Sequence, residues 1–442
     1  AWSRRMPDRV GGRWRVPSDK SITHRALLLA AAIPGRWSLE APLRAADTES
    51  TAATLRRLGS ALPSLADRME WVSPGWAAWR SPHDVLDCGN SGTTARLVLG
   101  LLAGRPGIEA TLTGDASLRR RPMRRVAEPL RGAGADIEEL GEPDRLPLRV
   151  RGTALRPIAY VSSVASAQVK SALLLAGLAS HARVEVYEPT PTRDHTERLL
   201  RAAGARLTCE PDARGGVRVA FEPGGALQPL AGHVPGDLSS AMFLIVRALL
   251  ADEGEVVLED VGINPTRTAA LQLLRRLGAD IEVRNPRDGL GHEPMADLVV
   301  RPSALRPLAI EPSDVPGLID ELPALVALGV RVPGEHVLRG AAELRVKESD
   351  RLAALATNLR RLGVEVEEYS DGLRWQGTRR ALRGRVEAFG DHRIAMAFGV
   401  LAAVPGNDLC IDEPDVVAIS FPSFWEALHG LGGPAVGVRG RA

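Results

Sequence analysis

The sequence predicts an α/β fold made of six repeated units, and three patterns lead to this prediction. The pattern Leu-x-x-x-Gly ends an amphipathic helical stretch six times, with its glycines at positions 59, 134, 204, 278, 363 and 432. Glycine directly after a helical pattern is a common helix stop. Four of these glycines precede strand-like stretches, which read ADIEE, ARLTC, ADIEV and VEVEE. A second series of helices alternates with the first, so each unit of about 70 residues is expected to be a small α/β subdomain.

The helices of the second series are apolar on nearly every side, but each begins with polar residues. They read SDKSITHRALLLAA, GNSGTTARLVLGLL, SAQVKSALLLAGLA, GDLSSAMFLIVRALL, DELPALVALGV and GDHRIAMAFGVLAAV. A helix that is apolar all round is buried, whereas an amphipathic helix lies at a surface. Free N–H groups and the helix dipole attract anions to helix N-termini. If three such N-termini from each half of the chain face one cleft, that cleft favours a strongly anionic ligand.

Two of these helix starts resemble each other closely. They are Val16-Pro17-Ser18-Asp19 and Val234-Pro235-Gly236-Asp237, which lie 218 residues apart, about half the chain. This spacing predicts two pseudo-equivalent halves of three units each. The chain is expected to cross from one half to the other near these two proline-containing segments.

The composition is that of a globular protein with more than one domain. The 442 residues are 45% hydrophobic and 25% charged, and a chain of this length usually forms two or more domains. No apolar stretch reaches the ~20 residues of a membrane span, and no basic-then-apolar leader opens the chain, so we expect a cytoplasmic protein. A net charge of +2 argues against a general nucleic-acid binder. Cys88, Cys209 and Cys410 lack metal-site spacing and are expected to be buried thiols.

Lysine is almost absent from the chain. It occurs at positions 20, 170 and 347, so arginine supplies the other 53 of the 56 basic residues. An ammonium group can shift its pKa and transfer a proton, as a guanidinium cannot. A lysine retained in this background is a candidate for a specific role, although three residues are few enough to survive by chance. Lys20 and Lys347 both lie in dense polar clusters, which favours function.

The first polar cluster is formed by Lys20, Ser21 and Arg25. Ser21 and Arg25 are four residues apart and therefore share one face of a helix. Ser18 or Asp19 can cap this helix. The cluster is either a capped helix with solvated charges or a cradle for an anion.

Four further clusters stand in the first half of the chain. Gly92 lies in the turn GNSGTTAR, whose small residues let backbone amides approach a ligand, although an ordinary tight turn would look the same. Arg121 belongs to the basic run RRRPMRR, and the proline after it restricts its backbone. Residues 166–168, which read SAQ, offer neutral hydrogen-bonding groups at a helix start. Arg193 lies in TRDH, a stretch that on its own favours a simple helix cap over a binding site.

Acidic and basic side chains stand side by side in the second half of the chain. Asp320 and Glu321 precede an apolar helix, either as caps or as a general base held near a cation. Residues 345–351 read RVKESDR, and such alternating charges usually mark a solvated face. Here, however, Lys347 stands next to Glu348 and near two arginines, which is how a proton-transfer pair is built.

Taken in order, these clusters resemble the 5-enolpyruvylshikimate-3-phosphate synthase family of enolpyruvyl transferases. The matching stretches are DKSITHRALLLAA, GNSGTTARL, LTGDASLRRRPM, SAQVKSALLLAGL, PTRDHTERLL, VPGDLSSA, NPTRT, DELPAL, RVKESDRL and GDHRIAMA. They run in family order over nearly the whole chain. Each stretch alone is a weak signal, but the ordered set is specific.

The resemblance implies a two-domain inside-out α/β barrel of six βαβαββ repeats, three per domain. Residues 20–236 are expected in one domain and residues 1–19 plus 237–442 in the other, with the active site in the cleft between them. The implied reaction transfers the enolpyruvyl group of phosphoenolpyruvate to the 5-hydroxyl of shikimate 3-phosphate and releases phosphate. It proceeds by addition and elimination through a tetrahedral intermediate. The resemblance implies no metal or organic cofactor and no nucleic-acid or membrane partner, and we expect a monomer.

The resemblance also implies roles for individual residues. Those expected at shikimate 3-phosphate are Lys20, Ser21, Arg25, Ser166, Ala167, Gln168, Arg193, Asp320 and Lys347. Those expected at phosphoenolpyruvate are Lys20, Gly92, Arg121, Gln168, Arg351, His392 and Arg393. Asp320 is expected to take the 5-hydroxyl proton and Glu348 to handle protons at the methylene carbon. Lys20 and Lys347 are also expected to be catalytic, and the resemblance does not separate their proton-transfer roles from that of Glu348.

Three positions depart from familiar family forms. Ser18 stands where glycine is common, which bears on hinge freedom, and Ala167 stands where some members have a second serine for the phosphate. The stretch ISFP at residues 419–422 lacks a lysine that some members carry two residues before the phenylalanine. Gly92 keeps room beside the phosphoenolpyruvate subsite, so we expect glyphosate to compete there.

Two alternative functions are consistent with parts of the sequence. The sister enzyme that acts on UDP-N-acetylglucosamine usually carries a reactive cysteine on a loop near Arg121, but the stretch GDASLRRRPM contains none. A non-catalytic phosphometabolite-binding protein on the same scaffold would be expected to have lost its acid–base groups. Lys20, Asp320, Lys347 and Glu348 are all present.

Overall fold

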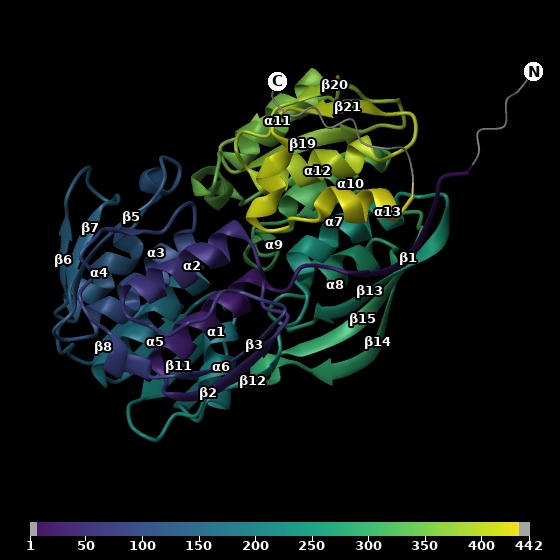
Figure 1. Cartoon of the computed structure of the whole chain (residues 1–442). Coiled ribbons are helices and arrows are strands. Elements are labelled where there is room, and N and C mark those ends of the chain that lie inside the picture. The colour runs from purple at the N-terminus through teal and green to yellow at the C-terminus, as the bar shows by residue number, and fades with distance from the viewer. Residues whose placement is uncertain (1–6, 433–442) are drawn as a thin grey trace, which may run out of the picture. The chain divides into compact units, whose positions relative to one another are not determined.

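The computed structural model describes residues 7–432, which divide into two compact units. The first unit comprises residues 18–235 and 288–293, and the second comprises residues 7–17, 236–287 and 294–432. In Figure 1 the chain of the first unit runs from purple to teal, and most of the second unit is green to yellow. Each unit has its own hydrophobic core, as expected for separately packed domains.

Three buried helices form the interior of the first unit. They are α1 (Lys20–Ala32), α3 (Gly92–Ala103) and α5 (Ala167–Ser180), and most of their residues are buried. The amphipathic helices of this unit are α2 (Ala46–Arg57), α4 (Arg124–Gly132) and α6 (His195–Ala202). Gly100 and Gly104 let α3 approach α5 closely, because a Cβ at either position would lie 2.3 Å from a backbone oxygen of α5. The predicted alternation of apolar and amphipathic helices is confirmed in this unit.

All residues of the first unit are described, and its strands form three sheets. In spatial order the first contains β12 (Ala231–His233), β2 (Gly35–Glu40) and β3 (Arg68–Ser73). The second contains β4 (Leu86–Asp87), β5 (Glu109–Thr113), β7 (Leu148–Arg151) and β6 (Asp136–Glu139). The third contains β10 (Arg206–Pro211), β11 (Val217–Glu222), β9 (Val184–Glu188) and β8 (Ile158–Val161).

The second unit follows the same plan. Its buried helices are α7 (Leu238–Leu249), α10 (Leu322–Arg331) and α12 (His392–Ala402). Its amphipathic helices are α8 (Ala269–Arg276), α11 (Arg351–Arg361) and α13 (Phe424–Gly430). A short helix, α9 (Val315–Leu318), precedes α10 and had no counterpart in the predicted pattern.

The described strands of the second unit form three further sheets. In spatial order the first contains β1 (Arg9–Arg15), β13 (Glu253–Gly262), β15 (Pro294–Arg301) and β14 (Asp280–Asp288). The second contains β16 (Ala309–Ile310), β17 (Gly334–Leu338), β19 (Gly372–Gly377) and β18 (Val366–Tyr369). The third contains β20 (Arg383–Val386) and β21 (Asp408–Ile411).

The sheets show that the six units are structural repeats. Five sheets contain the parallel strand pairs β4–β5, β8–β9, β1–β13, β16–β17 and β20–β21, one pair in each. In all of them but the last, an antiparallel strand extends the sheet. A parallel pair needs a crossover connection, and here a buried helix such as α3 between β4 and β5 provides it. The strand-like stretches after Gly134, Gly204, Gly278 and Gly363 become β6, β10, β14 and β18, as predicted.

The six Leu-x-x-x-Gly glycines end helices in the way that the sequence predicts. All six have positive φ values, between 73° and 107°. This left-handed backbone region strongly favours glycine, because a side chain would clash with the backbone. The helix stops of the amphipathic series are therefore confirmed.

Two of the points at which the chain passes between the units are related strand–helix junctions. β1 of the second unit leads into α1 of the first, and β12 of the first leads into α7 of the second. β1 pairs in parallel with β13, and β12 pairs in parallel with β2, so one sheet of each unit takes an edge strand from a distant part of the sequence. Asp19 donates its backbone N–H to Pro235 over 2.7 Å, and Asp237 donates to Pro17 over 2.8 Å. The two junctions, which are alike in sequence, therefore also make matching backbone hydrogen bonds.

Residues 288–293 belong to the first unit, whereas the sequence places them in the second domain. They connect β14 to β15 and contain a short 3-10 helix, η3 (Leu290–His292). Leu290 is fully buried in the core of the first unit. The sequence of so short a segment does not indicate which of the two hydrophobic cores Leu290 joins.

Two general expectations can also be compared with residues 7–432. The three cysteines are free thiols, but only Cys88 is buried, whereas Cys209 and Cys410 are half-buried. The expectation of buried thiols is therefore wrong for two of the three. Within the described part of the chain, every helix is too short or too polar to span a bilayer.

Candidate active site

Helix α1 begins with a capped first turn that also carries the predicted cations. Asp19 accepts a hydrogen bond from the backbone N of Ile22 over 2.9 Å, which satisfies one of the N–H groups left open at the helix start. The Lys20 ammonium lies 2.9 Å from the Asp47 carboxylate of α2, and its side chain remains 15% exposed. The cap and the cationic cluster therefore coexist.

Arg25 is buried one turn further along α1, among neutral hydrogen-bond partners. Its Nε donates to Thr196 Oγ1 over 2.7 Å, and its Nη2 donates to Ser171 Oγ over 2.8 Å. Nη1 donates to the backbone O of Ser21 over 2.9 Å. Burial lowers the pKa of Arg25 to about 10, and the nearby cation of Arg193 also lowers it. The charges of Arg25 and Arg193, both in the first unit, therefore influence each other.

The start of α5 is linked to the start of α3 through Gln168. Gln168 Oε1 accepts a hydrogen bond from Arg96 Nη1 over 2.7 Å, and its Nε2 donates to Thr93 Oγ1 over 3.1 Å. Ser166 precedes the first helical residue, Ala167, but its side chain does not cap the helix. The SAQ stretch thus meets the GNSGTTAR turn in space, which the sequence alone did not establish.

Two guanidinium groups flank Gly92, the first residue of α3. A Cβ at Gly92 would lie 2.7 Å from Arg96 Nη1 and 3.3 Å from Arg121 Nη1. Arg121 Nη2 donates to Asn90 Oδ1 over 2.5 Å, so its side chain is held beside the same turn. With glycine at position 92, both guanidinium groups can lie close to this turn without a shift of their side chains.

Arg193 lies in the loop between β9 and α6. Asp194 occupies the N-cap position of α6 but makes no capping hydrogen bond with its side chain. Its carboxylate instead accepts a hydrogen bond from Arg198 Nε over 2.9 Å. The simple helix-cap interpretation of TRDH is therefore wrong.

One group of three His and carboxylate side chains within residues 7–432 is close enough to hold a metal ion. It consists of Asp194, His195 and Glu293, whose ligand atoms lie within 4.8 Å of one another. Two of its contacts are already made within the protein, because His195 Nδ1 lies 2.6 Å from Glu293 Oε1 and Asp194 binds Arg198. The geometry is that of a buried histidine–carboxylate pair that joins α6 to residues 288–293.

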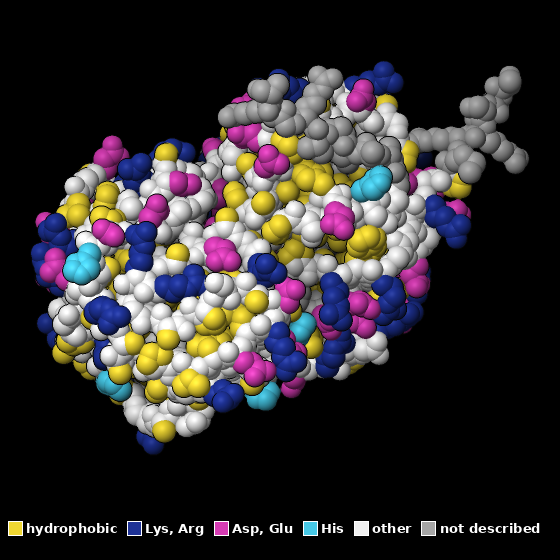
Figure 2. Space-filling model, viewed as in Figure 1, with side chains coloured by type: hydrophobic (Ala, Val, Ile, Leu, Met, Phe, Trp, Pro, Cys, Tyr) yellow, Lys and Arg dark blue, Asp and Glu magenta, His cyan; other side chains and the backbone are white. Residues whose placement is uncertain are grey.

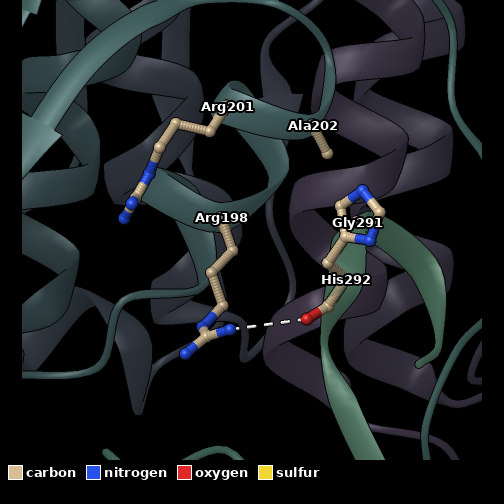
Figure 3. Close-up of a pocket in the computed structure, with 5 residues that line it drawn as sticks. All are labelled: Arg198, Arg201, Ala202, Gly291 and His292. Atoms are coloured by element: carbon tan, nitrogen blue, oxygen red, sulfur yellow. Dashed lines mark hydrogen bonds between the residues drawn. The ribbon is translucent and has the colours of Figure 1, made fainter. Parts of the chain in front are cut away.

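The pocket in Figure 3 is separate from the predicted ligand set. It has a volume of about 360 Å³ and is lined by Arg198, Arg201, Ala202, Gly291 and His292. Arg198 donates a hydrogen bond to the backbone O of His292 across it, over 3.4 Å. None of the predicted site residues lines this pocket.

Arg351, the first residue of α11, lies at the centre of a carboxylate cluster in the second unit. Its side chain is only 1% exposed; Nε lies 2.8 Å from Asp391 Oδ2 and Nη2 lies 2.7 Å from Glu348 Oε2. Nη1 lies 3.9 Å from Asp320 Oδ1. Burial opposes the charge of Arg351, but the surrounding carboxylates raise its pKa above the ordinary value. Burial would likewise raise the pKa of Asp391, but Arg351 lowers it below the ordinary value.

The other predicted residues of the second unit surround this cluster. Arg393 Nη1 donates to the backbone O of Asp320 over 2.6 Å. Burial lowers the pKa of Lys347, against the attraction of nearby Asp320 and Glu348. His392 is fully buried at the start of α12, where Asp391 accepts a hydrogen bond from the backbone N of Arg393 over 2.9 Å. The segment RVKESDR is therefore not a simple solvated face.

The paired acids before α10 have different surroundings. Glu321 occupies the N-cap position of α10 but makes no side-chain capping bond. Its carboxylate accepts a hydrogen bond from Ser239 and lies 3.6 Å from Arg267. Asp320 lies near Arg351 and Arg393 instead. Side-chain capping thus explains neither acid, and Asp320 is placed among cations as a general base would be.

The predicted residues divide between the two units, and we call the set in each unit its cluster. The first-unit cluster contains Lys20, Ser21, Arg25, Gly92, Arg121, Ser166, Ala167, Gln168 and Arg193. The second-unit cluster contains Asp320, Lys347, Glu348, Arg351, His392 and Arg393.

Three further side chains belong to these clusters but were not predicted. Asp47 pairs with Lys20, Arg96 binds Gln168, and Asp391 binds Arg351. Arg96 and Asp391 stand inside the motifs GNSGTTAR and GDHRIAMA, so the motifs themselves were an available signal. No sequence motif marks Asp47 as a site residue, because only the packing of α2 against α1 brings it to Lys20.

The two clusters have different chemical capacities. In the first, cations and neutral hydrogen-bond donors suit the binding of anions. In the second, carboxylates and an ammonium with a lowered pKa suit proton transfer. On the face shown in Figure 2, basic and acidic side chains are interspersed, so the cationic character belongs to the clusters rather than to that surface.

Comparisons with known proteins identify the family to which the chain belongs. The sequence profile of the family described as EPSP synthase (3-phosphoshikimate 1-carboxyvinyltransferase) matches residues 5–428. The 3-phosphoshikimate 1-carboxyvinyltransferase of Aquifex aeolicus is 46% identical, with 95% of this chain and 96% of the relative covered. That of a Thermus thermophilus strain is 49% identical, with 94% and 95% covered.

Solved structures show the same relationship. EPSP synthase from Acinetobacter baumannii has a TM-score of 0.81 and 37% identity, with 96% of each chain covered. The enolpyruvyl transferase NikO from Streptomyces tendae has a TM-score of 0.71 over 97% of this chain and 96% of that one. Its 17% identity makes this a likeness of fold alone. The predicted α/β fold is confirmed, and the chain belongs to the EPSP synthase family.

Proposed function

We propose that the first-unit cluster binds shikimate 3-phosphate and that the second-unit cluster performs the proton transfers of the family reaction. Membership of the family gives the chain its enzyme activity, that of a 3-phosphoshikimate 1-carboxyvinyltransferase. This activity transfers the enolpyruvyl group of phosphoenolpyruvate to shikimate 3-phosphate in the shikimate pathway. It serves the biosynthesis of chorismate and the aromatic amino acids.

The convergence of Asp320, Lys347 and Glu348 around Arg351 carries the proposal for the chemistry. Asp320 takes the proton of the 5-hydroxyl, which makes that oxygen a nucleophile toward the enol carbon. The backbone bond from Arg393 over 2.6 Å holds Asp320 in place. A general base held in this way typically contributes 10²–10⁴-fold to a rate.

Glu348 and Lys347 handle the proton at the methylene carbon. A proton must be added there when the tetrahedral intermediate forms, and one must leave from the resulting methyl group when phosphate is eliminated. Arg351 holds the Glu348 carboxylate at 2.7 Å. The lowered pKa of Lys347 supports a role in exchanging this proton, because it brings the ammonium closer to neutral pH.

Anion binding is assigned to the remaining residues. Lys20, Ser21, Arg25, Ser166, Ala167, Gln168 and Arg193 contact shikimate 3-phosphate, as do Asp320 and Lys347. Lys20, Gly92, Arg121, Gln168, Arg351, His392 and Arg393 contact phosphoenolpyruvate. The buried Nη1 of Arg351 donates no hydrogen bond within the described residues, which supports its use for a substrate oxygen. Charged donors of this kind replace the water that two phosphates and two carboxylates lose on binding.

The proposal includes the setting of the reaction. Both units contribute residues to the reaction, and the protein works as a monomer in the cytoplasm. The reaction uses no metal ion and no organic cofactor.

The proposal is tested by following phosphate release from phosphoenolpyruvate with shikimate 3-phosphate or UDP-N-acetylglucosamine as acceptor. We expect release with shikimate 3-phosphate only, and release with the nucleotide sugar alone would overturn the assignment. In the Asp320→Asn variant, kcat should fall by roughly 10²–10⁴-fold, since the amide cannot accept the proton. Glu335→Gln, on the exposed side of β17 in the same unit, is the matched control and should keep wild-type kcat. An active Asp320→Asn enzyme would show that another group is the base.

A further inference from the structure

Lys170 is the one lysine of the chain to which the proposed mechanism gives no role. It lies in α5, two residues after Gln168, and its side chain is 2% exposed. Its Nζ lies 2.8 Å from Glu188 Oε2 at the end of β9 and 2.6 Å from Glu197 Oε1 in α6. Both carboxylates are as deeply buried as the ammonium. Three elements of the first unit thus meet at one buried charge cluster, which we call the Lys170 triad.

The Lys170 triad is not explained by stability alone. Two carboxylates face a single ammonium, so the fully ionised cluster carries a net negative charge inside the protein. Glu197 Oε2 is buried and has no hydrogen-bond partner within residues 7–432. Buried ion clusters usually contribute little net stability, because the loss of hydration offsets the attraction. A positional role is therefore the better explanation for this arrangement.

Glu188 connects the Lys170 triad to the loop that carries Arg193. The backbone N of Thr192 donates to Glu188 Oε2 over 3.3 Å, which is the oxygen that also binds Lys170. The Thr192 hydroxyl donates to Glu188 Oε1. Thr192 directly precedes Arg193, so the ammonium, the carboxylate and the loop form one continuous chain of contacts.

Glu197 connects the Lys170 triad to Arg25. Lys170 is followed by Ser171 in α5, and Glu197 is preceded by Thr196 in α6. The Thr196 hydroxyl donates to Ser171 Oγ over 2.7 Å, and Arg25 donates to both hydroxyl groups. The contact between Lys170 and Glu197 therefore fixes α5 against α6 at the place where Arg25 is held.

We infer that Lys170 is a positioning residue for the shikimate 3-phosphate subsite, acting through Glu188 and Thr192 on Arg193 and through Glu197 on Arg25. The inference rests on the proposed role of Arg193 and Arg25 in binding that substrate. It also explains why lysine is kept at position 170 in a chain that otherwise uses arginine. A compact ammonium with three donors fits between two carboxylates, whereas a planar guanidinium requires a wider, fork-shaped site.

The first test cuts only the link between the Lys170 triad and the loop. Thr192→Val keeps the size of the side chain and leaves the three buried charges intact. We expect the KM for shikimate 3-phosphate to rise about tenfold, since one hydrogen bond to a charged group is lost. The KM for phosphoenolpyruvate should stay within about twofold of wild type, because the loop carries no residue assigned to that substrate. Thr153→Val, which also loses one hydroxyl hydrogen bond in the first unit, is the control and should change neither constant.

The second test removes the ammonium without changing the net charge of the cluster. Lys170→Met combined with Glu197→Gln leaves Glu188 as one negative charge, equal to the net charge of the ionised triad. We expect a larger rise in the KM for shikimate 3-phosphate than in Thr192→Val, again with little change for phosphoenolpyruvate. If this variant does not fold, Thr192→Val still decides the question. Lys170→Arg should fail to restore the wild-type constant.

A double-mutant cycle separates this inference from the proposed function. If Thr192 acts through Arg193, the effect of Thr192→Val should disappear in an Arg193→Met background. An unchanged KM for shikimate 3-phosphate in Arg193→Met alone would overturn the proposed role of Arg193 and, with it, this inference. A raised KM in Arg193→Met, together with wild-type constants in Thr192→Val, would overturn only the positioning role.

Discussion

Arg25 in the first unit and Arg351 in the second are both buried arginines in helices, but they have opposite surroundings. Arg25 donates to two hydroxyl groups and a backbone carbonyl, and its pKa is lowered to about 10. Arg351 contacts the carboxylates of Asp391 and Glu348, and its pKa is raised. The contacts of Arg25 do not neutralise its charge, which suits an anionic ligand. The contacts of Arg351 do, so its first effect is to fix carboxylates in place.

Removing each arginine should therefore have a different main consequence. Arg351→Met leaves Asp391 and Glu348 in place without their cation, and breaking such a buried pair costs about 3–5 kcal/mol of unfolding free energy. Arg25→Met leaves Ser171 and Thr196 bonded to each other, so we expect a loss of only about 1–2 kcal/mol. Urea unfolding of both variants measures the difference. Equal losses would contradict the contrast between the two sites.

The order of the two variants should be reversed when the KM for shikimate 3-phosphate is compared, with the larger effect in Arg25→Met. Arg25→Met should raise the KM for shikimate 3-phosphate roughly 10- to 100-fold, the value of one charged hydrogen bond. Arg25→Lys should restore part of the affinity, because it keeps the charge but not the fork of donors. Steady-state kinetics with each substrate varied in turn provides the measurement. An unchanged KM for shikimate 3-phosphate would remove Arg25 from the binding site.

Gly92→Ala sharpens the comparison within the first unit. The new methyl group would lie 2.7 Å from Arg96 Nη1 and 3.3 Å from Arg121 Nη1, so both side chains must move. We expect the KM for phosphoenolpyruvate to rise about tenfold, equivalent to about 1.4 kcal/mol, with the KM for shikimate 3-phosphate nearly unchanged. Gly132→Ala, where a Cβ meets nothing within 4 Å, is the matched control. A larger rise in the KM for shikimate 3-phosphate would contradict the assignment of Gly92 to phosphoenolpyruvate.

The smallest expected effect concerns the pH dependence of stability in the second unit. Arg351 holds the pKa of Asp391 below its ordinary value of 3.8. A carboxyl with a lowered pKa in the folded state stabilises the fold above its unfolded pKa, and this contribution is lost as the pH falls through the folded pKa. The stability difference between wild type and Asp391→Asn should therefore be largest near neutral pH and shrink below about pH 4. A difference that grows in acid would contradict the Asp391–Arg351 pairing.

Local patterns predicted the secondary structure well, because helix stops and helix burial depend on a few neighbouring residues. Each Leu-x-x-x-Gly stretch ended a helix, and each apolar stretch became a buried one. The same patterns failed for residues 288–293, whose burial in the first unit depends on a core formed more than fifty residues earlier in the chain. They also left open whether charged residues such as Asp194 and Glu321 cap helices, and in both cases the side chain binds elsewhere.

The candidate site divides in a similar way. Residues inside motifs, such as Lys20, Gln168 and Arg351, could be identified because several polar side chains gather at one helix start. Asp47 could not, since it reaches Lys20 only through the packing of α2 on α1. Sequence also marked Lys170 as unusual through the rarity of lysine, but it did not indicate a partner for it.

The sequence by itself determined the six α/β units, the buried helices and the motifs that belong to the EPSP synthase family. These features depend on periodicity, on glycine backbone preferences and on residue order, which are all local or one-dimensional properties. Tertiary structure alone decided which charges are neutralised among residues 7–432: Arg351 by Asp391, Lys170 by Glu188 and Glu197, and Arg25 by no carboxylate in hydrogen-bond contact. The physical reason is that electrostatic energy depends on distance and burial, and both are set by packing between segments far apart in the chain.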